Sequence, residues 1–598
     1  MTHNSGDSGL CFEIWFRRRK SQDTYTLQAG SREVKDAWTK DLERILWEQA
    51  VHNRALDIAQ WDLECEFNNT DHRTELNGVE RLIVRRGQPF TINLHLRSGV
   101  YQPGGSALNL TVETGPQPSD QYGTQASFGL TDQIDTSRWS AAVTSPPGNM
   151  VSLSICSPPD APIGRWRLTL GQVGRVDFVL LYNPWCTGDV VYMDSEDKLR
   201  EYILAQDGII YRGGWKYPIP TPWNYGQFED GILNVCLRIL DMNPKCLRNP
   251  GKDASGRRNP IYVSRVLSAM VNCNDDKGLL LGRWTDDYDG GVSPLSWKGS
   301  VEILRNWDTN ACQPVRFGQC WVFAAVACSV SRALGIPCRL VTNYNSAHDT
   351  NSNLVIERYV DENGQLVQKS RDMIWNYHCW VENWMTRPDL KPGFDGWQVM
   401  DPTPQEKSEG VYCCGPIPLK AIKEGELTYK YDAPFVFAEV NADVHTFMKR
   451  KDGSTKNIIS SVNVGLKIST KSVGSDRRED ITHLYKYPEG RELRYDTTVT
   501  CYQDTPMSHY TTICRQDTSS LLGYDATGLA HLYLGSFSHS SLQILSNSVR
   551  MEGKRCCTAI FRSLQRCSIG FKSRIWLATQ GHSETCPEAT PALSWLCA

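Results

Sequence analysis

Apolar and polar side chains alternate along several short stretches in the first third of the chain. In residues 90–96 (FTINLHL) apolar side chains recur at every second position, which is the period of a β-strand with one buried face. Turn-forming residues separate such stretches, as in residues 86–89 (RGQP) and 102–105 (QPGG), at a spacing typical of a β-sandwich. The pattern predicts an all-β region from about residue 60 to residue 185.

From residue 189 to about residue 443 helical and strand patterns are mixed, as residues 231–240 (GILNVCLRIL) show for a helix. Residues 320–328 (CWVFAAVAC) are apolar on nearly every face of a helix, which is typical of a buried core helix. Residues 374–382 (IWNYHCWVE) alternate as a strand, and residues 396–402 (GWQVMDP) predict a short strand that a proline ends. The region is therefore predicted to be α+β.

The predicted core helix begins at a cysteine, Cys320. The first N–H groups of a helix have no carbonyl partner within it, so this end carries partial positive charge that favours a thiolate. The position therefore suits a nucleophile. The alternative is that Cys320 is a small buried apolar side chain, as many cysteines beside apolar stretches are.

Two further residues favour the nucleophile. The strand pattern of residues 374–382 places His378 on a rigid element, and the strand that ends before Pro402 leaves the Asp401 carboxylate at its end. A cysteine nucleophile needs a base that accepts its proton, and the base needs an acceptor on its second ring nitrogen. Cys320, His378 and Asp401 can supply these three functions, so together they predict a catalytic triad.

Four segments carry a resemblance to a known family: GQCWVFAAVAC (318–328), LGIPCRLVTNYNSAHDTNSNL (334–354), MIWNYHCWVENWMTRPDL (373–390) and GWQVMDPTPQEKSEGVYCCGP (396–416). They resemble the catalytic core of the transglutaminases, most closely the tissue type (type 2), and the resemblance extends over roughly residues 60–490. It implies a multidomain α+β protein with an N-terminal immunoglobulin-like β-sandwich at residues 56–186 and a papain-like core at residues 187–490. It assigns the nucleophile to Cys320, the base to His378 and the orienting carboxylate to Asp401.

The resemblance also implies the reaction, which is calcium-dependent protein-glutamine γ-glutamyl transfer. The cysteine would take the acyl group of a protein glutamine as a thioester, and a lysine amine or a polyamine would open it; water would give deamidation instead. The implied partners are proteins with accessible glutamine and lysine side chains. An indole N–H, at Trp284, would stabilise the oxyanion. The alternative for Trp284 is a half-buried aromatic side chain without a catalytic role.

Two oxygen-rich turns are candidate calcium sites, at residues 349–353 (DTNSN) and 272–278 (NCNDDKG), because Ca²⁺ prefers oxygen ligands. Solvated turns have the same composition, which leaves a structural role open for both. The resemblance assigns three calcium sites, with the ligands Asp349, Asn351, Asn353 and Asp372 in one, Asn272, Asn274 and Asp276 in another, and Asn441 and Glu489 in the third.

The tissue type further implies two regulatory features. Cys413 and Cys414 are adjacent, and the resemblance implies a reversible disulfide switch relayed through Cys273; two free thiols are the alternative. Lys216 and Tyr217 match the core side of a guanine-nucleotide site. Its arginines lie in a C-terminal β-barrel of the family, so nucleotide binding is expected to be weak or lost.

Both ends of the chain depart from the family. Residues 1–55 predict two strands, 12–16 and 24–27, and then a helix with one apolar face, which resembles the end of a pleckstrin-homology domain. So short a segment is not expected to bury a core of its own. Residues 491–598 are rich in Ser, Thr and Cys and match nothing in the family's two C-terminal β-barrels. We therefore expect a poorly ordered tail and no barrels.

Composition excludes several classes of protein. The 598 residues carry a formal net charge of −3, which gives no basic surface for nucleic acid. No apolar run approaches about 18 residues, so no membrane span is expected. The N-terminus does not resemble a signal peptide, so we expect a cytoplasmic protein, with export by another route left open. The 21 cysteines are then mostly reduced thiols, and the glycosylation sequons at Asn68 and Asn109 stay unused.

Three classes of function remain. The first is the acyltransferase, the second is a thiol protease or amidase that uses the same triad, and the third is a catalytically impaired scaffold that lacks the barrels. Retention of Cys320, His378, Asp401 and Trp284 argues against the scaffold. The acidic turns and Trp284 argue against the protease.

Overall fold

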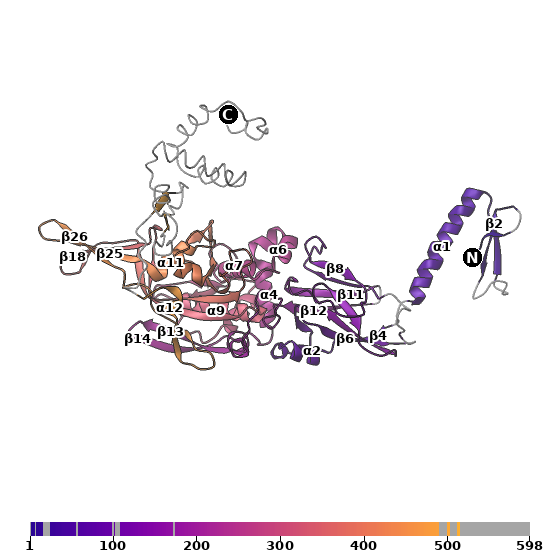
Figure 1. Cartoon of the computed structure of the whole chain (residues 1–598), viewed down its shortest axis with the longest axis horizontal. Helices are drawn as coiled ribbons and strands as arrows, with labels where there is room; N and C mark the ends of the chain where they lie inside the picture. The colour runs from indigo at the N-terminus through magenta and orange to yellow at the C-terminus, as the bar shows by residue number, and fades with distance from the viewer. Residues whose placement is uncertain are drawn as a thin grey trace, which may run out of the picture. The chain divides into compact units, whose positions relative to one another are not determined.

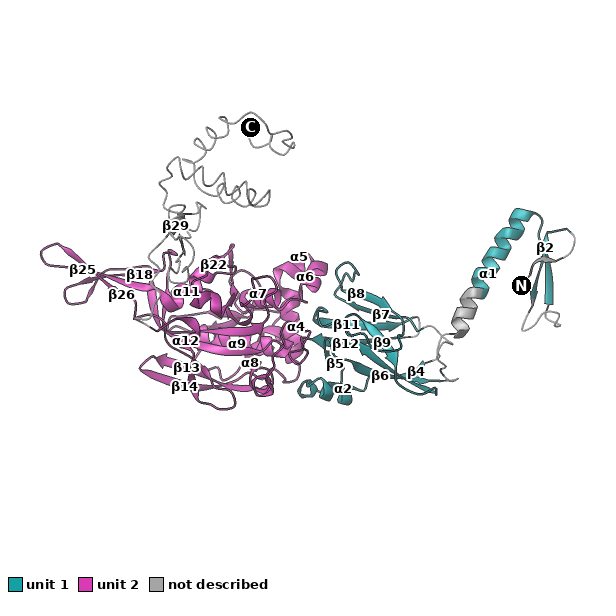
Figure 2. Cartoon of the chain, viewed as in Figure 1, with its two compact units in different colours: residues 1–181 teal, residues 182–598 magenta. Residues whose placement is uncertain are grey.

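The computed structural model describes residues 2–5, 8–15, 24–54, 58–97, 101, 108–171, 174–488, 499–502 and 511–514. The chain divides into two compact units, residues 1–181 and 182–598, which Figure 2 shows in two colours. Each unit has its own buried apolar core. Within the described ranges, every helix is too short or too polar to cross a lipid bilayer.

The first unit contains a β-sandwich of two sheets, with strand orders β4-β6-β10-β9 and β5-β12-β11-β7-β8. Alternate side chains of β6 and β11, such as Ile92 and Leu168, are almost fully buried in one shared core, as the strand period requires. The predicted sandwich is confirmed. Its strands are β4 (Ile58–Asp62), β5 (Ile83–Arg85), β6 (Phe90–Leu96), β7 (Leu110–Thr114), β8 (Gln125–Phe128), β9 (Ser140–Val143), β10 (Met150–Cys156), β11 (Gly164–Leu170) and β12 (Gly174–Leu181).

A short helix, α2 (Cys65–Asp71), followed by a 3₁₀ turn at Glu75–Asn77, packs beside β5. Asn68 on this helix is only 1% exposed, and its Nδ2 donates to the carbonyls of Leu63 and Thr91 at 2.7 Å each. The amide nitrogen of the first glycosylation sequon is therefore inside the fold. Asn109, in the second sequon, is exposed.

The N-terminal segment contains the two predicted strands, β2 (Cys11–Trp15) and β3 (Thr24–Gln28), and the predicted helix, α1 (Arg32–Arg54), together with a strand that was not predicted, β1 (Thr2–Ser5). Phe12 on β2 is fully buried, but Val34, Trp38 and Ile45 on α1 remain 40–45% exposed. A three-stranded sheet and one helix thus leave much of the apolar helix face in solvent. Its likeness to a pleckstrin-homology domain stays a prediction.

The second unit contains a six-stranded sheet with strand order β24-β21-β20-β17-β27-β28. Its longest pair is antiparallel: β17 runs beside β20, with Val341 opposite Trp380. The strands are β17 (Cys338–His348), β20 (Met373–Met385), β21 (Gly396–Asp401), β24 (Cys414–Pro418), β27 (Leu466–Lys471) and β28 (Arg478–Asp480).

Helices cover both faces of β20. On one face Tyr377 contacts Trp321 of α9 (Cys320–Leu334), with ring centroids 6.1 Å apart. On the other face His378 points toward α11 (Ala433–Asn441), and Trp380 contacts Tyr485 of α12 (Thr482–Tyr485). Figure 1 shows the helices α9, α11 and α12 of the second unit beside its strands. Because both faces are covered, the strand is buried on both sides from His378 to Asn383.

The remaining helices of the second unit are α3 (Glu196–Leu199), α4 (Ile232–Met242), α5 (Pro244–Arg248), α6 (Pro250–Gly256), α7 (Pro260–Met270), α8 (Val301–Thr309) and α10 (Leu419–Lys423), with a π-turn at Arg200–Leu204. Its other strands are β13 (Asp207–Gly214), β14 (Tyr217–Asn224), β15 (Leu280–Gly282), β16 (Val315–Gly318), β18 (Val355–Asp361), β19 (Leu366–Gln368), β22 (Lys407–Ser408), β23 (Val411–Tyr412), β25 (Asp443–Lys449) and β26 (Thr455–Ser460). This mixture confirms the predicted α+β core.

A buried polar network joins α12 to the central sheet. Arg339 on β17 and Glu382 on β20 form an ion pair of 2.7 Å in which neither side chain is more than 6% exposed. Tyr485 donates to the second oxygen of Glu382 and accepts a 2.8 Å hydrogen bond from Trp380. The two buried charges therefore offset each other, with a hydrogen bond from Arg339 Nε to Glu382 at 2.7 Å, although Arg339 Nη2 makes no hydrogen bond among the described residues.

Beyond residue 488 the structure describes one pair of strands, β29 (Val499–Tyr502) and β30 (Thr511–Cys514). The predicted tail and the expected absence of barrels otherwise lie outside the described residues, as does Glu489.

Candidate active site

Cys320 is the first residue of α9, and Gln319 precedes the helix in an extended conformation. Every side chain of this helix is buried, as the apolar pattern predicts. Cys320 itself retains 7% of its exposure. The sulfur therefore lies at the positive end of a buried core helix.

Two neighbours stabilise the thiolate of Cys320. The Cys379 thiol, the next residue after the histidine on β20, hydrogen-bonds to its sulfur, and His378 adds a second hydrogen bond and a charge. Burial opposes ionisation, but these interactions outweigh it and lower the pKa of Cys320 to about 5. The group is thus a thiolate at neutral pH.

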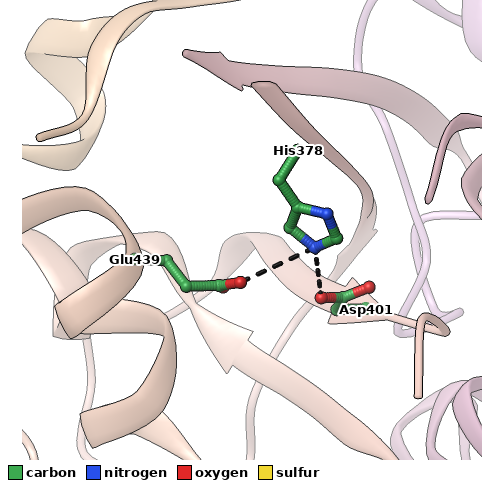
Figure 3. Close-up of side chains that lie close together, drawn as sticks. All are labelled: His378, Asp401 and Glu439. Atoms are coloured by element: carbon green, nitrogen blue, oxygen red, sulfur yellow. Dashed lines mark hydrogen bonds and ion pairs between the residues drawn. The ribbon is translucent and has the colours of Figure 1, made fainter. Parts of the chain in front are cut away.

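His378 and Asp401 form a buried pair. The Nε2 of His378 lies 2.7 Å from Oδ2 of Asp401, and the two side chains are 4% and 1% exposed (Figure 3). Burial alone would disfavour the imidazolium, but the charge and hydrogen bond of Asp401 raise the pKa of His378 well above its usual value. A protonated His378 beside a Cys320 thiolate is the pair that acyl transfer requires.

The turn after β21 fixes the second oxygen of Asp401. Its Oδ1 accepts a 2.9 Å hydrogen bond from the Thr403 amide, which leaves Oδ2 for His378. The predicted strand end before Pro402 therefore orients the carboxylate as well as exposing it to the imidazole. The structure thus brings all three residues of the predicted triad together.

Sequence reasoning missed three residues of this site: Cys379, Gln405 and Glu439. Glu439 on α11 is fully buried, with Oε1 3.6 Å from His378 Nε2 (Figure 3). Burial and the Asp401 charge outweigh the favourable charge of His378 and raise the pKa of Glu439 to about 8. A lone glutamate within the apolar stretch APFVFAEV was the available signal for Glu439. Gln405 lies in a loop, and no pattern in the sequence around it indicates a functional role.

Trp284 lies beside the first turn of α9. Its ring stacks on Phe323 at 6.3 Å, and Gln319 Nε2 donates to the adjacent Arg283 carbonyl at 2.8 Å. The indole is 43% exposed. The structure thus places Trp284 beside the start of the helix that carries Cys320, with part of its ring exposed.

The first candidate calcium group is one folded loop. Asp349 Oδ1 accepts from the amides of Asn351 and Ser352, and Asp372 Oδ1 accepts from Thr350. Burial, together with the charge of Asp372, raises the pKa of Asp349. Within the described part of the chain neither carboxylate has a basic side chain as partner, and the side-chain oxygens of Asn351 and Asn353 lie on the same loop. Two neighbouring buried carboxylates without a counter-charge fit a divalent cation.

The second candidate group also fits a cation. Oδ1 of Asp276 is buried and, among the described residues, has no hydrogen-bond partner. Burial and the adjacent Asp275 raise the pKa of Asp276 to about 7. Asn272 is held by hydrogen bonds from its Nδ2 to the carbonyls of Pro402 and Tyr412, and its Oδ1 accepts from the Asn274 amide. Of the third group, Asn441 ends α11 and Glu489 lies outside the described residues.

The three predicted redox cysteines are free thiols. Tyr412 donates its amide to Asp275 at 2.6 Å, which brings the turn that holds Cys273 beside the segment that holds Cys413 and Cys414. Burial raises the pKa of Cys273 and of Cys413 to about 11 each, and that of Cys414 well above its usual value. Few of these thiols are ionised at neutral pH, which slows disulfide formation.

Lys216 and Tyr217 lie at the turn of the β13–β14 hairpin. Tyr217 is 80% exposed, and the Lys216 ammonium lies 5.3 Å from the ring of its neighbour Trp215. The structure thus presents both candidate nucleotide contacts on an open hairpin.

Two family models match the chain. The model described as "Transglutaminase family" matches residues 59–172, within the β-sandwich. The model described as "Transglutaminase-like superfamily" matches residues 301–402, which include Cys320, His378 and Asp401. The two matches thus cover the sandwich and the candidate site.

Curated relatives match over most of the chain. It is 57% identical over 445 residues to protein-glutamine gamma-glutamyltransferase 2 from Cavia cutleri and 58% over 440 residues to the enzyme of that name from Gallus gallus, and it covers 64% of each. These matches span 73% and 72% of the chain. Protein-glutamine gamma-glutamyltransferase 5 from Homo sapiens is 47% identical over 73% of the chain, which covers 62% of that relative.

A solved structure shares the fold. The crystal structure of red sea bream transglutaminase superposes with a TM-score of 0.67 and 44% identity, over 73% of this chain and 66% of that one. The chain spans just under two thirds of the length of these relatives.

Proposed function

Because the chain belongs to the transglutaminase family, we propose that it is a protein-glutamine γ-glutamyltransferase that forms isopeptide crosslinks. The observation that carries the proposal is the position of Cys320 at the start of a core helix, close to the buried His378–Asp401 pair, which lowers the pKa of its thiol. The substrates are proteins with accessible glutamine and lysine side chains, and polyamines can replace the lysine.

In the first half-reaction the Cys320 thiolate attacks the side-chain carboxamide of a glutamine. His378, held protonated by Asp401, donates its proton to the departing nitrogen, and ammonia leaves. A thioester on Cys320 remains. Asp401 orients the imidazole and stabilises its charge.

The tetrahedral intermediate needs hydrogen-bond donors for its oxyanion. We assign this role to the Trp284 indole N–H and to the Cys320 backbone N–H, which is one of the unpaired donors of a helix start. The stack of Trp284 on Phe323 and the hydrogen bond from Gln319 to Arg283 support the assignment, because both tie the indole to the first turn of α9.

In the second half-reaction the neutral imidazole of His378 accepts a proton from the incoming amine, which attacks the thioester and releases Cys320. Aromatic side chains around the site, among them Trp321 and Trp375, limit the access of water, so amines compete with hydrolysis. Where water wins, the product is a glutamate.

Calcium is the proposed cofactor. Asp349, Asn351, Asn353 and Asp372 would hold one ion and Asn272, Asn274 and Asp276 another, with Asn441 and Glu489 as candidates for a third. Bound calcium would supply charge that offsets the buried carboxylates and orders both loops. The Asn272 turn contacts Pro402, the residue after Asp401, so order in that turn supports the catalytic carboxylate.

The test is incorporation of a fluorescent primary amine into casein, with calcium or with a chelator. We expect calcium-dependent incorporation by the full chain and none by Cys320→Ala. Added GTP should leave the rate unchanged, because Lys216 and Tyr217 form an open hairpin.

Cys236→Ala is a matched control, since Cys236 is another buried free thiol but lies on α4. Casein cleavage without amine incorporation would replace the proposal with a thiol protease. Full activity in the presence of the chelator would contradict the proposed role of calcium.

A further inference from the structure

Three hydrogen-bonding atoms from separate elements converge behind the catalytic cysteine. They are Nε2 of His378 on β20, a carboxyl oxygen of Asp401 at the end of β21 and one of Glu439 on α11, all within 4.8 Å of one another (Figure 3). Two carboxyl groups thus compete for one ring nitrogen. Asp401 is bound at 2.7 Å, and Glu439 remains at 3.6 Å.

The side-chain amide of Gln405 stands between the competitors. Its Nε2 lies 2.9 Å from Asp401 Oδ2, 2.8 Å from Glu439 Oε1 and 3.0 Å from His378 Nε2. A primary amide carries two N–H groups, and here one donates to each carboxyl oxygen. The Asp401 carboxylate can only accept, which favours the amide nitrogen on its side, and the 3.0 Å approach to His378 Nε2 is not a hydrogen bond while the imidazole is protonated.

We propose that Gln405 is a positioning residue of the catalytic centre, which holds Asp401 as the partner of His378 and prevents Glu439 from replacing it. The proposal rests on the proposed function, because it concerns the same triad. It also goes beyond that function, since a neutral side chain outside the triad determines which carboxyl group the imidazole uses.

The physical consequence reaches Cys320 through two steps. The Asp401 charge keeps His378 protonated, and the His378 charge stabilises the thiolate. Without the Gln405 donors, Asp401 loses one of the bonds that fix its Oδ2, and Glu439 is free to rotate toward the imidazole. The protonated imidazole is then held less firmly. Among the described residues, Cys414 on β24 also lies close to the two carboxyl groups, and Cys379 and Tyr377 lie close to Cys320 from the other face of β20.

The test measures the thiolate directly, so it does not need transferase activity. Cys320 in the full chain is alkylated with iodoacetamide between pH 4 and pH 10, and the labelled peptide is quantified by mass spectrometry. Gln405→Met keeps the length of the side chain but removes both donors. We expect the pH at which labelling begins to rise by about one unit, and kcat to fall about tenfold with an unchanged KM for the glutamine substrate.

Gln405→Asn is the second variant, for the case in which Gln405→Met does not fold. Its amide is one methylene short of the carboxyl oxygens, so the same upward shift is expected. Gln227→Met is the matched control: Gln227 is buried and donates to the carbonyls of Ile203 and Ala205, away from the triad.

The outcomes separate the two proposals. A wild-type labelling profile in both Gln405 variants would overturn the positioning role, even if the protein crosslinks. The positioning role would also be overturned if Gln227→Met shifted the profile equally, because a general loss of packing would then explain the effect. If Cys320 of the unaltered protein labelled only near pH 9, the proposed thiolate nucleophile would fail instead.

Discussion

The chemistry of the site depends on one thiolate and on the neighbours that stabilise it. Cys379 is the neighbour with the largest effect on Cys320, although it belongs to the opposite face of β20 from His378. A hydrogen bond to a charged group contributes about 1.5–3 kcal/mol, which corresponds to about 1–2 pKa units. Cys379, beside the proposed base His378, therefore contributes to the stability of the Cys320 thiolate.

Replacing Cys379 with alanine should raise the pKa of Cys320. We expect the iodoacetamide labelling profile of Cys320 to move upward by about 1–2 pH units, because the thiolate loses a donor. Cys328→Ala tests specificity, since Cys328 is buried on the same helix as Cys320 but contacts Cys338. An unshifted profile in Cys379→Ala would mean that His378 alone stabilises the thiolate.

Residue types and local patterns were enough to find the predicted triad. Cys320 begins an apolar helix, His378 lies in an alternating strand, and Asp401 precedes a proline; each has a local sequence signal. Gln405 has no such signal, because its role depends on contacts with β20 and α11 across the fold. Position in three dimensions, which no local pattern encodes, decides its function.

At the scale of elements, β20 holds the site in register by being buried on both faces. Its alternation was predicted correctly, but the alternation did not show that Cys379 and Val381, on the opposite face from His378, are also fully buried. A strand that is covered on both sides has no solvent-exposed face. Alternation alone therefore cannot show that helices pack on both faces of β20. Helix α9 on one side and α11 with α12 on the other supply those layers.

The stability of the second unit should depend strongly on the buried Arg339–Glu382 ion pair. Arg339→Met leaves Glu382 charged and unpaired inside the protein, which is expected to cost about 3–5 kcal/mol of unfolding free energy. The measurement is the urea dependence of tryptophan fluorescence, together with the activity at low denaturant.

The double variant Arg339→Met with Glu382→Gln is the control. It removes the charge but keeps a carbonyl oxygen for the Tyr485 hydroxyl, so most of the lost stability should return. If the double variant were as unstable as the single one, lost packing of the Arg339 side chain, and not the unpaired charge, would be the cause.

At the scale of the whole molecule, the two units differ in what can bind to them. All candidate calcium ligands belong to the second unit, and the β-sandwich core is apolar. The sequence predicted both regions, since their periods differ. It also predicted that the N-terminal segment is too short to bury a core of its own, and Trp38 on α1 is 45% exposed.

Calcium should therefore stabilise the two units unequally. In differential scanning calorimetry of the full chain, calcium should raise the unfolding temperature of the second unit. At a calcium concentration 100 times the dissociation constant, the added unfolding free energy should be about 2.7 kcal/mol. The unfolding temperature of the sandwich should be the same with calcium as with the chelator.

A matched pair of variants makes this assignment specific. Asp349→Asn should reduce the calcium-dependent rise, whereas Asp361→Asn should not, since Asp361 makes similar turn hydrogen bonds outside the candidate groups. If calcium raised the unfolding temperatures of the sandwich and of the second unit equally, its effect would not come from binding at these candidate sites.

The buried amide of Asn68 has a consequence for biosynthesis. An oligosaccharide can be attached only while that nitrogen is accessible, and in the folded sandwich it is occupied by two carbonyls. In a compartment that contains the glycosylation machinery, sugar transfer at Asn68 would compete with closure of the sandwich, and each glycosylated chain would be a chain that cannot finish folding.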